Sequence, residues 1–158
     1  HACAECGAPR DEHDRHVRFR LPDPVLALDL DPAELEARTW GDDVLMRVKD
    51  VGAFVRCLLP VPLTGGYRVT FGVWLSVDPD LLRQAHAIWW EPEYASLELT
   101  GRLANAVPPW AERVMGAPAE AVVLDGEHVP YITRSQDEVL AGVLTREWPH
   151  AEVLAGLP

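Results

Sequence analysis

The first residues of the chain carry the spacing that most clearly suggests chemistry. Cys3 and Cys6 are separated by two residues and followed by Gly7, in the run CAECG. Two thiolates at this spacing can hold one tetrahedral metal ion, and a following glycine permits a tight backbone turn. Zinc needs further ligands, and the sequence has no second CxxC pair. We therefore expect a structural zinc ion bound by Cys3 and Cys6, with His16 as the third ligand.

Other interpretations of this cysteine pair stay open. A further ligand could come from His13, or from Cys57 on a predicted strand. The pair could instead be redox-active, although such a pair usually precedes a helix, which residues 7–22 do not resemble. It could also bind nothing. The odd cysteine count, with no secretory signal in the sequence, argues against a disulfide framework, so we expect a cytoplasmic protein.

A second group of residues, Arg56, Trp74, Arg102 and Asn105, suggests a ligand site. Arg56 stands in an otherwise apolar predicted strand, where an unpaired charge is costly. Trp74 offers an aromatic face on which a ligand can stack. One interpretation is a polar cleft for a small molecule, lined by these four side chains. We favour a structural role, with Arg56 in an ion pair and Trp74 in the core or a subunit contact.

The remaining motifs and the net charge narrow the classes of function. The sequence contains no phosphate-binding glycine loop, no GxSxG elbow and no HExxH helix, so the common hydrolase, kinase and dinucleotide signatures are absent. A formal net charge of −11 repels phosphate backbones, so we expect no nucleic-acid partner. No apolar run approaches the ~18 residues of a membrane span. The acidic surface suits a basic protein partner.

The elements that position these groups follow from the periodicity of the sequence. Residues 68–77 alternate between apolar and other side chains, which predicts a central strand with one face in the core. We expect further strands over 44–48, 54–63, 94–103 and 121–124, and helices over 31–38, 79–90 and 139–146, with Ser135 in the cap of the last. Residues 1–30 are expected to be loop. Short helices between hairpin-connected strands predict an α+β fold with a mostly antiparallel sheet and an N-terminal CxxCG knuckle.

The length of 158 residues matches one domain, so we expect residues 1–158 to form a single domain that includes a metal-knuckle-like segment over 1–22. Several segments in order resemble the uncharacterised bacterial family called domain of unknown function 2199: CAECG, RLPDP (20–24), VRCLLPVPL (55–63), FGVWLSV (71–77), TGRLANAVPPW (100–110) and HVPYI (128–132). The resemblance brings no activity. It implies a histidine between CxxCG and Leu21-Pro22, where His16 is the nearest, and a glycine where this chain has Cys57. Cys57 is then a small buried apolar side chain rather than a family ligand.

Two classes of function follow. The first is a zinc-stapled domain of immunity or accessory type that binds another protein. The second is a small-molecule-binding protein or an enzyme that uses the predicted cleft. We favour the first because no catalytic motif is visible in the sequence. A concave cluster of Arg56, Trp74, Arg102 and Asn105 would favour the second, and a flat exposed aromatic patch the first.

Overall fold

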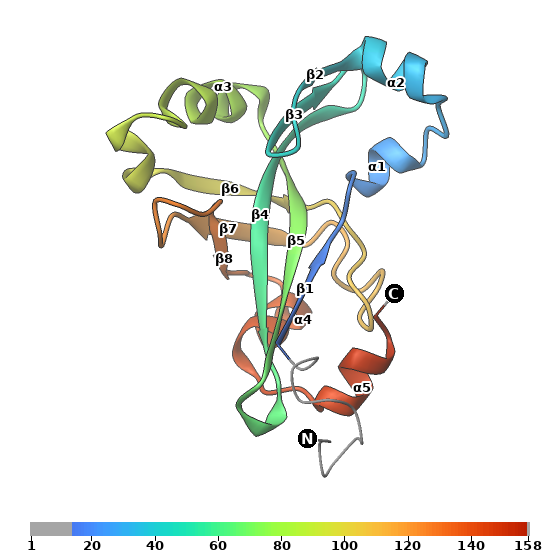
Figure 1. The fold of residues 1–158 in the computed structure, drawn as a ribbon, viewed down its shortest axis with the longest axis vertical. Coiled ribbons are helices and arrows are strands. Elements are labelled where there is room, and N and C mark those ends of the chain that lie inside the picture. Colours follow the sequence, from blue (N-terminus) through green and yellow to red (C-terminus); the bar gives the residue numbers. More distant parts are fainter. Residues whose placement is uncertain (1–13, 158) are drawn as a thin grey trace.

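Strand β5, Arg68–Val77, is the centre of the sheet, as its alternating pattern predicts. In the computed structural model, which describes residues 14–157, its alternate apolar side chains lie in the main core: Val69, Phe71, Val73, Leu75 and Val77. A turn at Thr64–Gly66 joins β5 to β4, Gly52–Pro62, and Gly65 and Gly66 adopt the positive φ angles that this turn requires. The two strands form a long antiparallel hairpin through the molecule (Figure 1).

The sheet closes on itself around this hairpin. Strands β6 (Glu98–Leu103), β7 (Pro118–Val122) and β8 (Tyr131–Arg134) follow β5 in antiparallel order, and β8 returns to pair with β4 in parallel. The ring β5-β6-β7-β8-β4 is a closed five-stranded barrel. Where β6 meets β5, a Cβ on Gly101 would lie only 2.2 Å from the Ser76 carbonyl oxygen, so this approach needs glycine. The predicted α+β class and the mostly antiparallel pairing are confirmed, whereas the closure was not predicted.

Three short strands and five helices flank the barrel within the described residues. Strand β1 (Asp14–Arg18) runs parallel to β5, and β2 (Thr39–Gly41) and β3 (Leu45–Val48) extend the sheet along β4. The helices are α1 (Asp23–Leu26), α2 (Pro32–Arg38), α3 (Pro79–Ile88), α4 (Glu138–Thr145) and α5 (His150–Ala155). Figure 1 shows α2, α3, β2 and β3 at one end of the hairpin and α4 and α5 near the other.

The predicted helix starts are confirmed at two of three places. The carboxylates of Asp31 and Asp78 each accept a backbone N–H of the first helical turn, from Glu34 and Asp80, at 2.8 Å. At α4 the cap is Asp137, which accepts from Leu140 N at 2.9 Å. Ser135 was the wrong choice because its hydroxyl donates to the Pro118 carbonyl instead.

Other elements differ from the prediction. The strand expected over 94–103 is only β6, because a 3-10 helix at Pro92–Ser96 precedes it and the Tyr94 hydroxyl donates to the His128 carbonyl at 2.6 Å. The strand expected at 121–124 is β7, three residues earlier at its start. Residues 14–18 and 23–26, expected to be loop, form β1 and α1.

Apolar residues bury in two clusters. The larger fills the barrel and includes Cys57, and the smaller lies outside it, where α1, β3 and Trp74 meet. None of the helices between residues 14 and 157 has the length and apolar character needed to cross a membrane. Cys3 and Cys6 of the expected knuckle lie outside the described residues.

Candidate functional site

Arg56 and Trp74 meet across the β4–β5 hairpin, where they are register partners. The guanidinium carbon of Arg56 lies 4.2 Å from the centroid of a Trp74 ring, a cation–π distance. Both side chains are buried, with Arg56 only 3% exposed. Burial lowers the pKa of Arg56 to about 10, so the side chain is still a cation at neutral pH.

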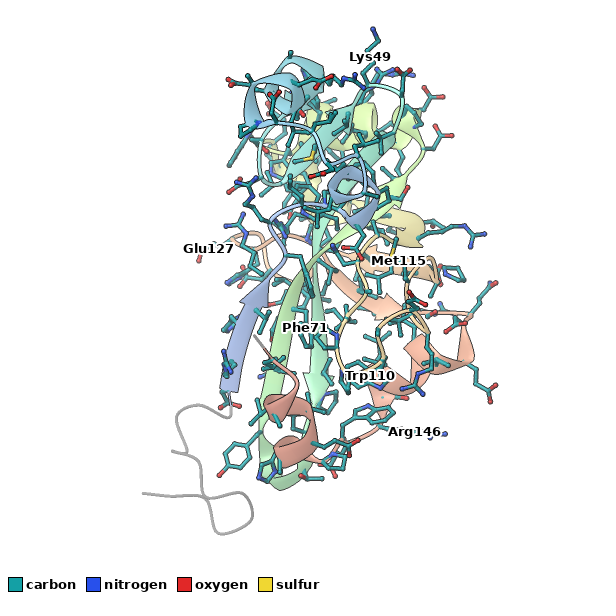
Figure 2. The ribbon with its side chains drawn as sticks, turned by 90° about the vertical axis from the view of Figure 1, so that its right-hand side faces the viewer. Lys49, Phe71, Trp110, Met115, Glu127 and Arg146 are labelled. Carbon is teal, nitrogen blue, oxygen red and sulfur yellow. The ribbon has the colours of Figure 1, made fainter. Side chains whose placement is uncertain are left out.

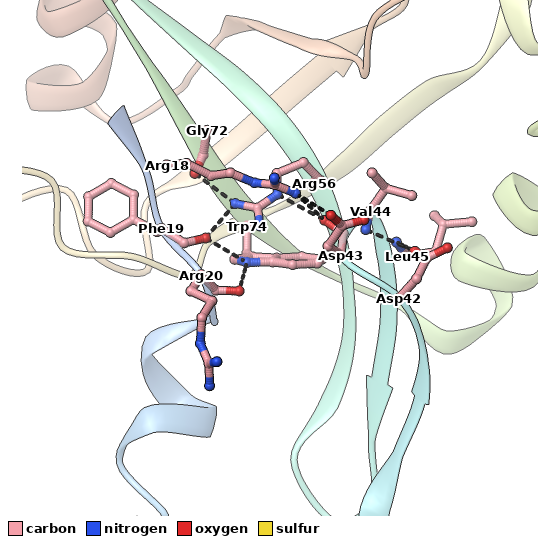
Figure 3. Close-up of polar contacts among 10 residues, drawn as sticks. All are labelled: Arg18, Phe19, Arg20, Asp42, Asp43, Val44, Leu45, Arg56, Gly72 and Trp74. Atoms are coloured by element: carbon pink, nitrogen blue, oxygen red, sulfur yellow. Dashed lines mark hydrogen bonds and ion pairs between the residues drawn. The ribbon is translucent and has the colours of Figure 1, made fainter. Parts of the chain in front are cut away.

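The polar atoms of this pair hold the chain segment that follows β1 (Figure 3). Arg56 donates through Nη1 to the carbonyl oxygens of Phe19 and Gly72, the latter at 2.8 Å, and through Nε to that of Asp43 at 3.1 Å. Trp74 Nε1 lies within hydrogen-bond distance of the carbonyl oxygens of Phe19 and Arg20. Backbone that β1 leaves unpaired is therefore satisfied by these two side chains.

Asn105 holds the next residues of the same segment and also contacts Trp74. Its Oδ1 accepts from Trp74 N at 2.8 Å, and its Nδ2 donates to the Leu21 carbonyl and to Asp23 Oδ1, each at 3.0 Å. The other oxygen of Asp23 accepts from Ala106 N at 2.7 Å. Asn105 is fully buried, so these hydrogen bonds use the whole amide.

Arg102 does not join this cluster. It lies exposed on β6, opposite Ser76, and donates to the Gly116 carbonyl at 3.1 Å. The structure thus brings together three of the four residues predicted to line a cleft, and most of their polar atoms bond to this chain's own backbone. That they bind a ligand stays a prediction.

The predicted metal ligands are described only in part. His16 is exposed on β1, beside Thr70 of β5, while Cys3 and Cys6 lie outside the described residues. Among residues 14–157, no three His, Cys, Asp or Glu side chains are grouped so as to hold a metal ion. Cys57 lies in the barrel core, where burial raises the pKa of its thiol, so it stays protonated and apolar.

A large concave feature lies between α3 and one face of the β2–β3 hairpin. Trp40 and Arg47 are cross-strand partners, and Lys49 N donates to the Arg38 carbonyl, so these four side chains share one face. Across from them His86 of α3 contacts the Trp40 ring edge-on at 5.1 Å. We call this cavity of about 900 Å³ the α3 groove; its lining is Arg38, Trp40, Arg47, Val48, Lys49, Asp50, Val51, Gly52, Pro79, Leu82, Arg83 and His86.

The α3 groove collects positive charge on an acidic chain. Of its four Arg and Lys side chains, Arg38 is paired with Glu34 at 3.0 Å and Arg83 with Asp80. Arg47 and Lys49 form no ion pair within the described residues, and Asp50 is the single acidic side chain in the lining. Figure 2 shows Lys49 projecting at this end of the molecule. The groove therefore presents uncompensated cations beside an exposed indole ring.

The comparison with family models decides the family. The model of an uncharacterized protein conserved in bacteria, DUF2199, matches residues 2–147. The chain belongs to this family. The resemblance drawn from the sequence is thereby confirmed. The DUF2199 match covers the residues of the α3 groove as well as Arg56, Trp74 and Asn105. No curated protein and no solved structure matches the chain.

Sequence reasoning missed the residues of the α3 groove in this DUF2199 protein. A signal existed, because Arg38 and Trp40 alternate on one side of the turn at 41–43 and Arg47 and Lys49 alternate on the other. If residues 39–41 are recognised as a strand, the hairpin places all four on one face. The three-residue length of β2 hid this pattern.

Proposed function

We propose that this protein is a ligand-binding domain whose α3 groove takes a small organic anion with an apolar or aromatic part. The observation that carries the proposal is the pair of cations, Arg47 and Lys49, that have no carboxylate partner within residues 14–157 and stand beside the exposed Trp40 ring. A carboxylate, sulfonate or phosphate group on a ligand would supply the missing partner.

The lining and the size of the groove support a ligand with an apolar part. The Trp40 ring, Pro79 and Leu82 give the lining its apolar part. A volume of about 900 Å³ falls in the range of small-molecule sites. The formal charge of −11 disfavours a long polyanion, because most of the surface would repel it. A small anion fits both properties.

The cleft expected from Arg56, Trp74, Arg102 and Asn105 has less support as the site of such a ligand. Arg56, Trp74 and Asn105 donate hydrogen bonds to the backbone carbonyls of residues 19–21. Arg102 lies apart from them on β6. The α3 groove offers side chains that are not committed in this way. It is therefore our choice within the small-molecule class of function.

The protein-interaction role expected from the sequence has one supporting feature. Trp90, just after α3, is 87% exposed, and an exposed indole on an acidic surface suits a basic protein partner. One ring does not make an apolar patch of the size that marks an interface. We keep this role as the second candidate.

Removing the two unpaired cations of the groove is expected to weaken anion binding. Anilinonaphthalene sulfonate supplies an aromatic anion, and phenylnaphthylamine supplies a similar ring system without the charge. The variant Arg47→Gln, Lys49→Gln should bind the sulfonate at least about tenfold more weakly, because two charge-assisted contacts are lost. Its binding of the uncharged probe should stay the same. Fluorescence titration measures both affinities.

The matched control removes two cations elsewhere. Arg102 and Arg134 are both exposed, on β6 and β8, so the variant Arg102→Gln, Arg134→Gln has the same net charge as the groove variant. It should bind the sulfonate as the unaltered protein does. Equal affinities of the two variants would reject the groove as the binding site.

We also propose that Cys3, Cys6 and His16 bind one structural zinc ion. The support is the CxxCG spacing, together with the exposure of His16 on β1, where its ring makes no hydrogen bond to residues 14–157. A bound metal would offset the backbone entropy of ordering a polar segment, about 1–2 kcal/mol per residue.

Replacing both thiols is expected to abolish zinc binding without unfolding the barrel. The variant Cys3→Ser, Cys6→Ser should lose stoichiometric zinc in elemental analysis and keep the cooperative thermal transition. His16→Gln should lower the zinc content or affinity, whereas His128→Gln, another exposed histidine, should not. Unaltered protein purified under reducing conditions without stoichiometric metal would rule the zinc ion out.

A further inference from the structure

A second cavity, of about 320 Å³, lies on the outer face of the barrel beside β1. The odd-numbered residues of this part of β4 and β5, such as Cys57 and Phe71, point into the barrel, so Arg56, Leu58 and Gly72 lie on the outer face. The register of β1 sets Arg18 beside Gly72 and His16 beside Thr70. The loop over 127–129 closes the other side, and its residues include Glu127 and His128.

Arg56 brings a buried charge to this cavity without a carboxylate of its own. Three of its hydrogen bonds go to neutral backbone carbonyls, through Nε and Nη1. The nearby carboxylate of Asp43 is bound by Arg18 at 2.7 Å, and this hydrogen bond lowers the pKa of Asp43, which keeps it ionised. A cation that is 3% exposed and is bound only by backbone carbonyls and an indole ring has a desolvation cost that an anion would reduce.

One nitrogen of the Arg56 guanidinium, Nη2, is left without a hydrogen-bond partner in the described range of residues. In that range every fully buried side-chain nitrogen has a hydrogen-bond partner. Because Nη2 has none, it is not fully buried and is accessible from outside the protein. Arg56 is one of the residues that line the cavity, which is the open space next to it. The free N–H donors are thus available to a molecule in the cavity.

The surrounding groups favour a negative guest. Arg18 packs against Gly72, where an added Cβ would lie 3.4 Å from Arg18 Cγ, and both residues line the cavity. The ring of His128 is held by Asp125, whose Oδ2 lies 3.0 Å from Nδ1. Glu127 is the one acidic residue in the lining. The lining therefore contains two guanidinium groups and one carboxylate, and a second carboxylate, that of Asp43, is bound to Arg18. Arg56 is the cation of this group that has no acidic partner.

We propose that this cavity is a binding site for a small oxyanion, a carboxylate or a phosphate group, held by the free Nη2 of Arg56 together with Arg18. The two N–H groups of Nη2 are charge-assisted donors for the oxygens of such a group, because those of Nε and Nη1 already donate to backbone carbonyls. The site is separate from the α3 groove, since the two linings share no residue. It therefore stands or falls independently of the α3 groove, while His16, the proposed zinc ligand, also belongs to its lining.

Titration with inorganic phosphate and with acetate tests the site and separates the two sources of an oxyanion. The Nε–Hε signal of Arg56 in a ¹H–¹⁵N spectrum reports directly on the guanidinium. We expect a saturable shift with a Kd on the order of 1 mM for at least one of the two anions. Response to both anions identifies a general oxyanion site, and response to phosphate alone identifies a phosphate site.

Two variants that leave Arg56 in place should move the affinity in opposite directions. Arg18→Gln should weaken binding at least about tenfold, and Glu127→Gln should strengthen it, because it removes the opposing charge. Arg102→Gln is the matched control, since Arg102 is also exposed and also donates to a backbone carbonyl. No saturable shift with either anion, or the same affinity in Arg18→Gln and Arg102→Gln, would overturn the proposal.

Discussion

Replacing Val73 by aspartate is expected to leave the protein unfolded at neutral pH. Val73 is fully buried in the barrel core, opposite Cys57 on β4, where no polar side chain can pair with a carboxylate. An unpaired charge at such a place costs several kcal/mol, comparable with a total stability of about 5–15 kcal/mol. Circular dichroism should show loss of the cooperative thermal transition.

Two further variants separate burial from a general effect of mutation. Thr133→Asp places the same side chain at an exposed position of β8 and should leave the melting temperature nearly unchanged. Val73→Ala keeps the site apolar and should lower the free energy of unfolding by about 2 kcal/mol. A Val73→Asp protein that melts at the temperature of the unaltered protein would show that β5 does not face the core in this way.

The sequence predicts best the elements whose local pattern agrees with their surroundings. Strand β5 alternates strictly, and α2 and α3 each begin with Asp-Pro, so their starts were predicted correctly. Strand β1 was missed because Val17 is its only apolar residue and its partner β5 lies more than fifty residues away in sequence. A strand that is held by the edge of another strand needs no apolar face of its own.

Closure of the barrel leaves almost no local signal. It depends on a single parallel register position between Leu58 and Tyr131 and on the close approach of Gly101 to Ser76. The sequence around Leu58 and Tyr131 has no feature that marks a strand pairing. Gly101 does not mark one either, since a glycine within a strand has several explanations. Barrel closure depends on the order of the strands in space, and the periodicity of the sequence carries no information about that order.

The candidate sites were predicted only where one residue type was conspicuous. Arg56 stood out as a charge in an apolar strand. It forms hydrogen bonds together with Trp74 to the segment after β1, and it lines the cavity on the outer face of the barrel. The α3 groove was missed because its cations look like ordinary surface residues in the sequence. Only the pairing of Trp40 with Arg47 and the placement of His86 opposite them bring these side chains together.

Exchanging the side chains of Asp23 and Asn105 is expected to restore most of the stability that either single change removes. Asn105→Asp sets two carboxylates side by side in a buried place and should cost about 3 kcal/mol. Asp23→Asn sets two amide groups donor to donor and should also destabilise the protein. In the double variant, the new carboxylate at position 105 accepts from Trp74 N and from the new amide at position 23, whose oxygen in turn accepts from Ala106 N. Urea denaturation gives the four free energies of unfolding for the cycle.

The exchange loses the donation from residue 105 to the Leu21 carbonyl and sets a carboxylate oxygen against it, so the double variant should remain about 2 kcal/mol below the unaltered protein. Asp31→Asn is the matched control for the aspartate change, because asparagine caps a helix as well as aspartate does. Additive losses in the double variant would show that Asp23 and Asn105 do not act as a pair. Recovery would establish that the segment joining β1 to α1 is held to the barrel by Asn105, and that the bracing by Arg56 and Trp74 has a second anchor where α1 begins.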